Sequence, residues 1–313
     1  MPISAAPSSF PGGLNADLHC HSQVSDGTLA PEELARRAHA NGVQLFSLTD
    51  HDELDGLGRA RSAAGALGIV FIDGVEISVT WGGETIHVVG LRIDPANEAL
   101  RAGLAATRDG RDARAREMSD SLARAGVPDA YAGALKYVAN PAMVGRTHFA
   151  RYIVERGLCR DVRDVFQRFL SEGKPGFVPH RWARLADAVG WIRDAGGIAV
   201  LAHPGRYRLD DTALWSLIAD FRAAGGEGIE VVCGSHTPEQ YRRFAQIAHE
   251  SGLRASRGSD FHGPGESRAE LGALPPLPAS LVPVWHDWPE AARALSSARR
   301  MPGGVASPAA ARV

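Results

Sequence analysis

The stretch "NADLHCHSQVSDG", residues 15–27, places two histidines on either side of a cysteine at the end of a short apolar segment. In a β-strand successive side chains point to opposite faces, so Asp17, His19 and His21 would share one face while Cys20 lies on the other. The pattern therefore predicts a pair of histidine ligands beside a core cysteine. By itself the pair is a weak signal, because two structural histidines would produce the same spacing.

Outward from this segment, apolar stretches of strand length alternate with helical stretches. Strands are expected at residues 14–20, 43–50, 69–79, 85–93, 197–204, 228–234 and 254–262. Helices are expected at residues 30–42, 57–68, 184–196, 210–225 and 237–252, some with proline near the start and most with glycine at the end. This alternation predicts an α/β fold built on a parallel barrel or a doubly wound sheet.

The segment from 97 to 180 interrupts the alternation with helical periodicity rich in arginine, alanine and glutamate. We interpret it as an inserted helical cap subdomain placed over one end of the barrel. The barrel would then comprise residues 14–96 and 181–285. Residues 1–13 and 289–313 are expected to be flexible tails, because they are rich in small residues and proline.

Composition limits the classes of function. The 313 residues are 44% hydrophobic and 22% charged, as in a globular protein with a substantial core. A formal charge of −2 argues against binding long duplex nucleic acid, but allows a nucleotide or a short strand. No apolar run has the length of a membrane span, no secretory signal is recognisable, and the three cysteines lack paired spacing. We expect a cytoplasmic protein without membrane association; protein partners are not predicted.

Further residues of metal-ligand type lie at or near the ends of the expected strands. Together with the HxH pair they give nine positions: His19, His21, Asp26, His51, Glu76, His87, His203, Asp260 and His262. The carboxyl ends of parallel strands meet at one edge of a sheet or barrel, so these side chains are expected to converge. Burying so many histidines and carboxylates without a metal would be costly. The nine positions therefore predict a metal site.

The expected ligand atoms are nitrogen and oxygen, without thiolate. This set favours Mn²⁺, with Fe²⁺ or Zn²⁺ as alternatives, over a structural zinc site rich in cysteine. Glu76 and Asp260 are candidates to bridge neighbouring ions. Such a multinuclear site activates water for attack on phosphorus while the ions neutralise the phosphoryl oxygens.

The order of the motifs along the chain is specific. The HxH pair with its following aspartate, then "TDHD", "GVEIS", "HVVGL", "AHP" and "GSDFH", resembles the motif series of the PHP (polymerase and histidinol phosphatase) superfamily. The resemblance spans residues 14–285. It implies a distorted (β/α)7 barrel that holds two or three divalent metal ions at the carboxyl ends of its strands.

The resemblance also implies how the ligands are shared among the ions. The first ion would take His19, His21, Glu76 and Asp260, the second Asp26, His51 and His262, and the third Glu76, His87 and His203. We expect the catalytic residues to be Asp260, His262 and His203, with Asp260 orienting the attacking water. All nine positions carry usable ligands, which implies an active enzyme.

Two stretches in or beside the insertion, "GRTHFARYIVERG" and "GKPGFVPHRW", narrow the resemblance. They resemble the branch that contains 3',5'-nucleoside bisphosphate phosphatases and a 5'-to-3' exoribonuclease of short RNAs. Arg146 is a candidate to bind a phosphate in a bidentate fork, although a surface position at a helix start is the alternative. His148 and His180 are candidates to donate to phosphoryl or ribose oxygens, with a supporting role equally open.

The predicted function is hydrolysis of the 3'-phosphate of a nucleoside 3',5'-bisphosphate to give the 5'-monophosphate and phosphate. Removal of 5'-nucleotides from short oligoribonucleotides is the alternative within the same chemistry, because the metal site would serve both. A small enclosed pocket would favour the first and an open basic groove the second. A non-catalytic, metal-stabilised binding or polymerase accessory module is the alternative of another class.

Overall fold

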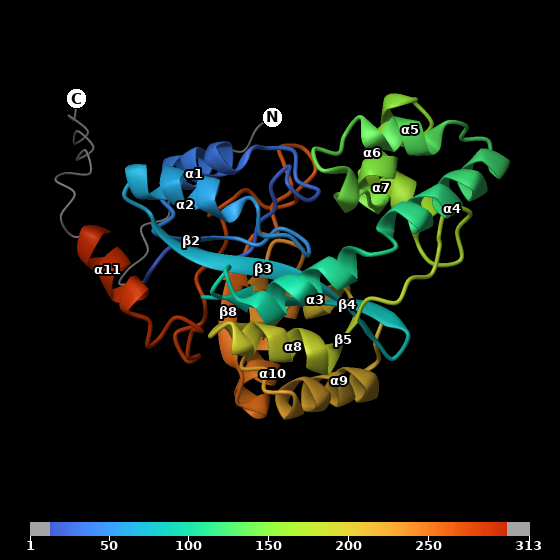
Figure 1. Cartoon of the computed structure of the whole chain (residues 1–313). Helices are drawn as coiled ribbons and strands as arrows, with labels where there is room; N and C mark the ends of the chain where they lie inside the picture. The colour runs from blue at the N-terminus through green and yellow to red at the C-terminus, as the bar shows by residue number, and fades with distance from the viewer. Residues whose placement is uncertain (1–12, 299–313) are drawn as a thin grey trace, which may run out of the picture.

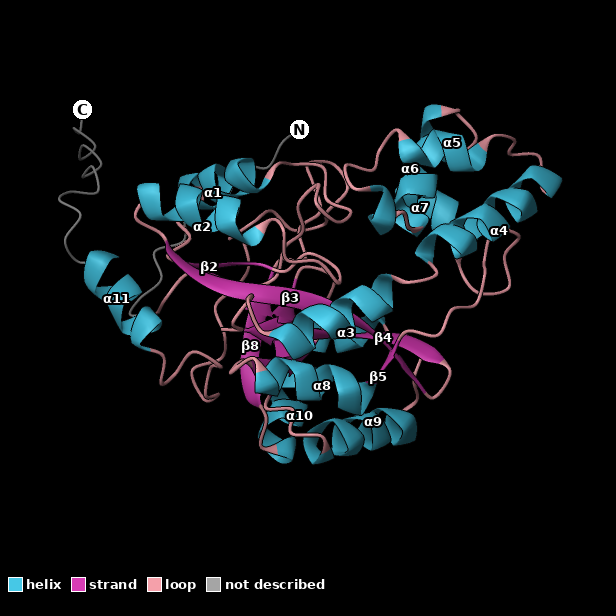
Figure 2. Ribbon diagram, in the orientation of Figure 1, coloured by secondary structure: helices cyan, strands magenta, loops and turns pink. Residues whose placement is uncertain are grey.

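The computed structural model describes residues 13–298, and one eight-stranded sheet forms its centre (Figures 1 and 2). The strands are β1 (Ala16–Asp17), β2 (Leu45–Leu48), β3 (Val70–Trp81), β4 (Glu84–Leu91), β5 (Ala183–Arg184), β6 (Ile198–Leu201), β7 (Gly228–Cys233) and β8 (Arg254–Gly258). Their order is β1-β2-β3-β4-β6-β7-β8, and the short β5 pairs with β3 outside this path. The predicted strands all form; most are shorter than predicted, while β3 extends to Trp81 and β4 begins at Glu84.

The two ends of the sheet meet, so the sheet is a nearly closed barrel. Leu18 N donates to Arg257 O at 3.1 Å, and His21 N donates to Phe261 O at 2.9 Å. These bonds join the segment after β1 to β8 and the segment that follows it. The predicted PHP-type barrel is confirmed at this level.

The direction of β4 differs from the prediction of a parallel barrel. β4 runs antiparallel to both β3 and β6. The reason lies in the two residues that connect it to β3, Gly82 and Gly83, whose φ angles are 58° and 87°. A glycine pair with positive φ is typical of a two-residue hairpin turn, whereas a parallel connection needs a long crossover.

Helices α1 (Pro31–Ala40), α2 (Leu57–Ala66), α3 (Glu98–Arg108), α8 (Leu185–Asp194), α9 (Asp211–Ala223) and α10 (Pro238–Ser251) surround the sheet (Figure 2). Helix α10 shows how the sequence sets their bounds. The Thr237 side chain accepts a hydrogen bond from Gln240 N, and the Gln240 side chain accepts one from Thr237 N. Pro238 opens the helix and Gly252 ends it in the left-handed conformation.

A second group of helices stands apart from the barrel in Figure 1: α4 (Arg111–Arg124), α5 (Ala130–Leu135), α6 (Arg146–Glu155) and α7 (Val162–Val165), with short turns η1 (Pro141–Met143) and η2 (Phe166–Leu170). Their apolar side chains, among them Leu122, Phe149 and Ile153, form a core of their own. We call residues 111–180 the cap. Helix α3 lies inside the range predicted as the insertion, yet its Leu100 and Leu104 belong to the main core.

Residues 289–298 form helix α11 (Pro289–Ala298) where the sequence analysis expected a flexible tail. Ala291 packs with Trp288 and Val284 in a cluster at the end of the barrel, so apolar contact orders this segment. The expectation is wrong for these residues, and residues 1–12 and 299–313 lie outside the described part of the chain. Between residues 13 and 298, no helix has the length and apolar character needed to cross a membrane.

Candidate metal centre

The nine predicted ligands converge at one rim of the barrel. Most of them follow a parallel strand directly: the HxH pair follows β1, His51 follows β2, His203 follows β6, and Asp260 and His262 follow β8. His87 lies early in β4, which reaches the same rim because the strand runs in the opposite direction. The hairpin therefore explains why His87 stands near the beginning of its strand, whereas the ligands after β1, β2, β6 and β8 stand beyond strand ends. Glu76 lies within the long strand β3.

Glu76 lies at the centre of the nine side chains and is fully buried. Its Oε1 atom lies 2.9 Å from His87 Nδ1 and 2.8 Å from His203 Nε2. Its Oε2 atom faces three more ring nitrogens: His19 Nε2 at 3.3 Å, His21 Nε2 at 3.2 Å and His51 Nδ1 at 2.9 Å. One carboxylate therefore joins five histidines.

Asp260 completes the set predicted for the first ion. Its Oδ1 atom lies 3.6 Å from His19 Nε2 and 3.3 Å from His21 Nε2, and these two nitrogens are 3.1 Å apart. Its Oδ2 atom accepts a hydrogen bond from Arg206 Nη1 at 3.0 Å. The structure thus brings together the four side chains that the resemblance assigned to one ion.

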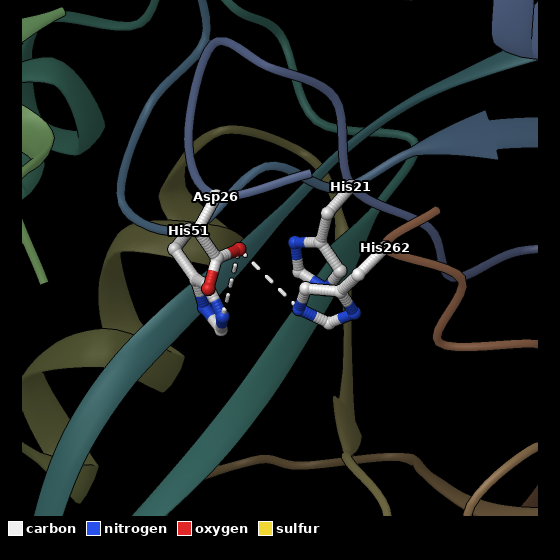
Figure 3. Close-up of side chains that lie close together, drawn as sticks. All are labelled: His21, Asp26, His51 and His262. Atoms are coloured by element: carbon white, nitrogen blue, oxygen red, sulfur yellow. Dashed lines mark ion pairs between the residues drawn. The ribbon is translucent and has the colours of Figure 1, made fainter. Parts of the chain in front are cut away.

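The second set, Asp26, His51 and His262, lies beside the first and is joined by His21 (Figure 3). Asp26 Oδ1 lies 3.3 Å from His262 Nε2 and 3.8 Å from His51 Nε2. In the third set, His87 Nδ1 and His203 Nε2 are 3.3 Å apart and both contact Glu76 Oε1. All three predicted sets are compact groups.

Cys20 lies on the other side of the segment, as predicted. Its side chain is fully buried in the main core, and its Sγ atom donates to Ser47 O at 3.4 Å. The ligand candidates are therefore His19 and His21 without the intervening thiol.

Three carboxylate oxygens test whether divalent ions fit this cluster. Asp26 Oδ1, Glu76 Oε2 and Asp260 Oδ1 are buried and accept no hydrogen bond from residues 13–298. Each of them instead faces histidine nitrogens within 3.8 Å. Buried carboxylates without donors are costly, and divalent cations would satisfy the oxygens and the ring nitrogens together. The residues present fit a multinuclear metal centre.

The charge states of these groups suit cation binding. Burial raises the pKa of Glu76 and Asp260, but the surrounding histidines outweigh it and hold both pKa values well below their ordinary range. Burial and Arg206 lower the pKa of His203 to about 4, so its ring is neutral. Burial also lowers the pKa of His21, but contacts with Asp260 and Glu76 outweigh it and raise this pKa to about 10. A bound cation would displace that proton, because only the neutral ring binds metal.

The backbone is strained at the same rim. Five non-glycine residues among those described have a positive φ, and three of them are Asp52, His203 and Asp260, at 49°, 25° and 53°. Such conformations persist where the surroundings enforce them, typically at functional sites.

Glu230, which the sequence analysis did not single out, supports two ligands at once. Its Oε1 atom lies 2.8 Å from His19 Nδ1, and its Oε2 atom accepts a hydrogen bond from His203 N at 2.6 Å. A carboxylate on the outer nitrogen of a ligating histidine fixes its tautomer and orientation. The signal was present in the sequence, since Glu230 is the only charged residue in the buried strand β7.

A cavity of about 120 Å³ lies between the ligand cluster and the cap. Asp26, His51, His87 and His262 line one side of it, and Arg111, Arg114, Arg146, Arg206, Phe166 and Trp182 are among the residues that line the rest. Burial, followed by the neighbouring arginines, lowers the pKa of Arg114 to about 9 and that of Arg146 to about 10. Cations that repel one another in a half-buried cavity provide a site for an anion.

The three predicted substrate ligands occupy different positions. Arg146 lines the cavity, as its predicted role requires. His148 is buried at the start of α6, where its Nδ1 atom accepts a hydrogen bond from Gly145 N at 3.1 Å. The ring centroids of His180 and Trp182 are 4.2 Å apart. Neither histidine is among the lining residues, so their role as substrate ligands stays a prediction.

Known proteins resemble this chain in sequence and in fold. The PHP domain family matches residues 17–138. A 3',5'-nucleoside bisphosphate phosphatase of Chromobacterium violaceum is 52% identical over 273 residues, which cover 87% of this chain and 96% of that protein. The chain belongs to the PHP family.

Other members agree with this placement. A 5'-3' exoribonuclease of Haemophilus influenzae is 44% identical to this PHP protein over 269 residues, covering 86% of this chain and 97% of the relative. A solved structure described as an amidohydrolase from Chromobacterium violaceum, with bound SO4 and no metal, superimposes with a TM-score of 0.86 at 51% identity. It covers 89% of this chain and 96% of that one. The predicted family is confirmed, and the chain is a PHP phosphoesterase.

Proposed function

We propose that this protein hydrolyses the 3'-phosphate of nucleoside 3',5'-bisphosphates, leaving the nucleoside 5'-monophosphate. The observation that carries the proposal is the cavity with two unlike sides, in which Asp26 and His262 face the arginines of the cap. A bisphosphate has one phosphate for each side. The name and 52% identity of the Chromobacterium relative support the same substrate class.

We assign the metal ions to the three side-chain sets given above, with Mn²⁺ as the favoured ion. When bound, such ions activate water and neutralise the oxygens of a phosphoryl group. Their ligands are preorganised by the chain itself. Glu230 holds the ring of His19, and Tyr207 Oη accepts a hydrogen bond from His87 N at 2.9 Å.

In the proposed reaction, a water oxygen forms a bond to phosphorus and the bond from phosphorus to the 3' oxygen breaks. The 3' oxygen takes up a proton and leaves as the hydroxyl of the nucleoside 5'-monophosphate, which balances the proton that the water loses. Asp260 is the residue we assign to orient this water and accept its proton, at Oδ1. That atom accepts no hydrogen bond within residues 13–298, and the low pKa of the carboxyl keeps it ionised. Arg206 holds the other oxygen, Oδ2, and so limits rotation of the carboxylate.

The arginines of the cap would bind the second phosphate. Among the described residues, no carboxylate lies within ion-pair distance of Arg114 or Arg146, so their charges are available to a ligand. A guanidinium suits a phosphate dianion because it donates in a planar fork. Phe166 and Trp182 add aromatic surface to the same cavity, where a base or ribose would stack.

A 5'-3' exoribonuclease activity is the second candidate, and the 44% identity to the Haemophilus enzyme favours it. Both reactions would place a 5'-phosphate among the arginines, and they differ in what the 3'-phosphate carries. The test compares adenosine 3',5'-bisphosphate (pAp) with a short 5'-phosphorylated oligoribonucleotide, each incubated with Mn²⁺-loaded protein. We expect pAp to give AMP and phosphate with the higher kcat/KM. A higher value for release of 5'-nucleotides from the oligomer would favour the exoribonuclease, and no product from either would favour a binding module.

A further inference from the structure

The cap contacts the barrel at or beside the ligands of one predicted ion, Asp26, His51 and His262. It makes no such contacts with the ligands of the other ions within residues 13–298. The first contact is at Asp26. Thr147 Oγ1 donates to Asp26 Oδ2 at 2.8 Å, and Arg151 Nη2 donates to Asp26 O at 2.6 Å. Both donors are on α6, one turn apart, so a single helix holds the side chain and the backbone of this ligand.

The second contact is beside His262. Arg151 also binds Glu266 through Nε and Nη2, each at 2.8 Å. Glu266 stands in the turn that follows His262, and Ser267 of the same turn accepts a hydrogen bond from His262 N at 2.7 Å. The Arg151 side chain is only 7% exposed, which strengthens its hold on the turn.

The third contact is beside His51. Arg111, the first residue of α4, forms a buried ion pair with Asp52. Asp52 also accepts hydrogen bonds from Ser78 N at 2.8 Å and Ser78 Oγ at 2.9 Å, which ties the segment after β2 to β3. The cap thus reaches the segments of all three ligands in the set Asp26, His51 and His262.

Four of the six remaining ligands are supported by other residues of the barrel. Glu230 binds His19 and His203, Tyr207 binds the backbone of His87, and Arg206 binds Asp260. Within residues 13–298, no hydrogen bond or ion pair joins the cap to these four ligands. The contrast separates one ion set from the others.

We infer that docking of the cap assembles the ion site formed by Asp26, His51 and His262, with Thr147 as its positioning residue. The inference rests on the proposed metal function. Thr147 holds Oδ2 of Asp26, which leaves Oδ1 directed at His262 and His51. Without that bond the carboxylate is free to turn about its terminal torsion, and the ion loses a prepared ligand.

A consequence follows for the substrate. Arg111 and Arg146 belong to the same cap and line the cavity, so an anion bound there and the ion at this site stabilise the same docked arrangement. Binding of each would then raise the affinity for the other, and the coupling must be reciprocal.

Thr147→Val tests the inference, because valine has nearly the same shape and lacks the hydroxyl. Mn²⁺ binding is measured by calorimetric titration and by elemental analysis after dialysis at limiting Mn²⁺. We expect one class of Mn²⁺ sites to weaken about 10- to 100-fold, the usual effect of removing a hydrogen bond that orients a metal ligand, while the other class is unchanged. Thr147→Ser keeps a hydroxyl and should restore the wild-type affinity.

Two further variants make the test specific. Arg151→Gln removes the bonds to Asp26 and Glu266 and should weaken the same class of sites. Thr107→Val is the matched control, since Thr107 is buried and, among residues 13–298, its hydroxyl binds only Gly103 O, 2.9 Å away in α3. It should lower stability and leave Mn²⁺ binding unchanged.

Three results would overturn the inference while wild-type protein binds Mn²⁺ normally. These are unchanged binding in Thr147→Val, equal weakening of every class of site, or failure of Thr147→Ser to restore affinity. Absence of Mn²⁺ binding in the wild-type protein would instead overturn the proposed function, and this inference with it.

Discussion

Glu230→Gln should weaken metal binding through the tautomer of a histidine. His203 N is only a donor, so the amide oxygen of glutamine must face it, as Glu230 Oε2 now does at 2.6 Å. The amide nitrogen then faces His19 Nδ1, where Oε1 now lies at 2.8 Å. Because that nitrogen is a donor, the His19 Nδ1 atom must become the acceptor and the ring proton must move to Nε2. Nε2 is the atom that faces Glu76 and Asp260.

The magnitude follows from what is lost at His19. The ring keeps its position and one hydrogen bond, but its ligating nitrogen is protonated in the preferred state and must lose that proton to bind a cation. Changes to such supporting carboxylates weaken metal affinity about 10- to 100-fold, which corresponds to about 1.4 to 2.7 kcal/mol. Both residues are buried, so solvent does not screen the effect.

The assay is calorimetric titration of the apoprotein with Mn²⁺, with thermal unfolding as a check on folding. Glu227→Gln is the control, because Glu227 is an exposed carboxylate just before β7 and should keep wild-type affinity. An affinity of Glu230→Gln equal to that of the control would refute the tautomer argument.

Three other substitutions test separate parts of the site. Arg146→Ala should keep the metals and lower kcat/KM on pAp by an amount equivalent to about 1.5–3 kcal/mol of transition-state stabilisation, the usual contribution of a hydrogen bond to a charged group. The loss should be smaller on a simple phosphomonoester, and equal losses on both would indicate a structural role. Asp260→Asn should slow phosphate release from pAp at least about 100-fold, and added Mn²⁺ should not fully restore it; near-wild-type turnover would contradict its assigned role. Cys20→Ala should lower the free energy of unfolding by about 1 kcal/mol and leave the metal content unchanged. Loss of a metal equivalent, measured by elemental analysis, would count against the place of Cys20 in the core.

The ligand cluster was predictable from sequence because each ligand stands in a short motif beside a strand. Strand alternation alone separated Cys20 from its two neighbours, and the buried position of its side chain agrees. Glu76 and His87 were found from their places in the motifs "GVEIS" and "HVVGL", although the direction of β4 was not predicted. The glycine pair at 82 and 83 carried that information, and only the hairpin it forms reverses the strand.

The arginine side of the cavity was less accessible to sequence reasoning. Arg111 and Arg114 stand among many arginines in the cap, and nothing local distinguishes them from solvated residues of a helix surface. Their place in the site depends on how the cap docks, which is a property of tertiary packing. Helix α11 was missed for a related reason, since Ala291 is buried in a cluster that includes residues remote in the sequence, such as Leu45 and Val200.

The reversed strand β4 also determines how the chain reaches the cap. β4 begins at the ligand rim and ends with Leu91 opposite Ile198, at the far end of the barrel. The chain must therefore travel back along the outside, and α3 makes that return in 11 residues, about 16 Å at 1.5 Å per residue. Helix α3 is thus a spacer of fixed length and phase. Adding one residue to α3 would advance the cap by about 1.5 Å and turn it by about 100° about the helix axis. This movement would carry Arg111 away from Asp52. The length of α3, a helix remote from the chemistry, therefore sets the alignment of the cap with the metal ligands.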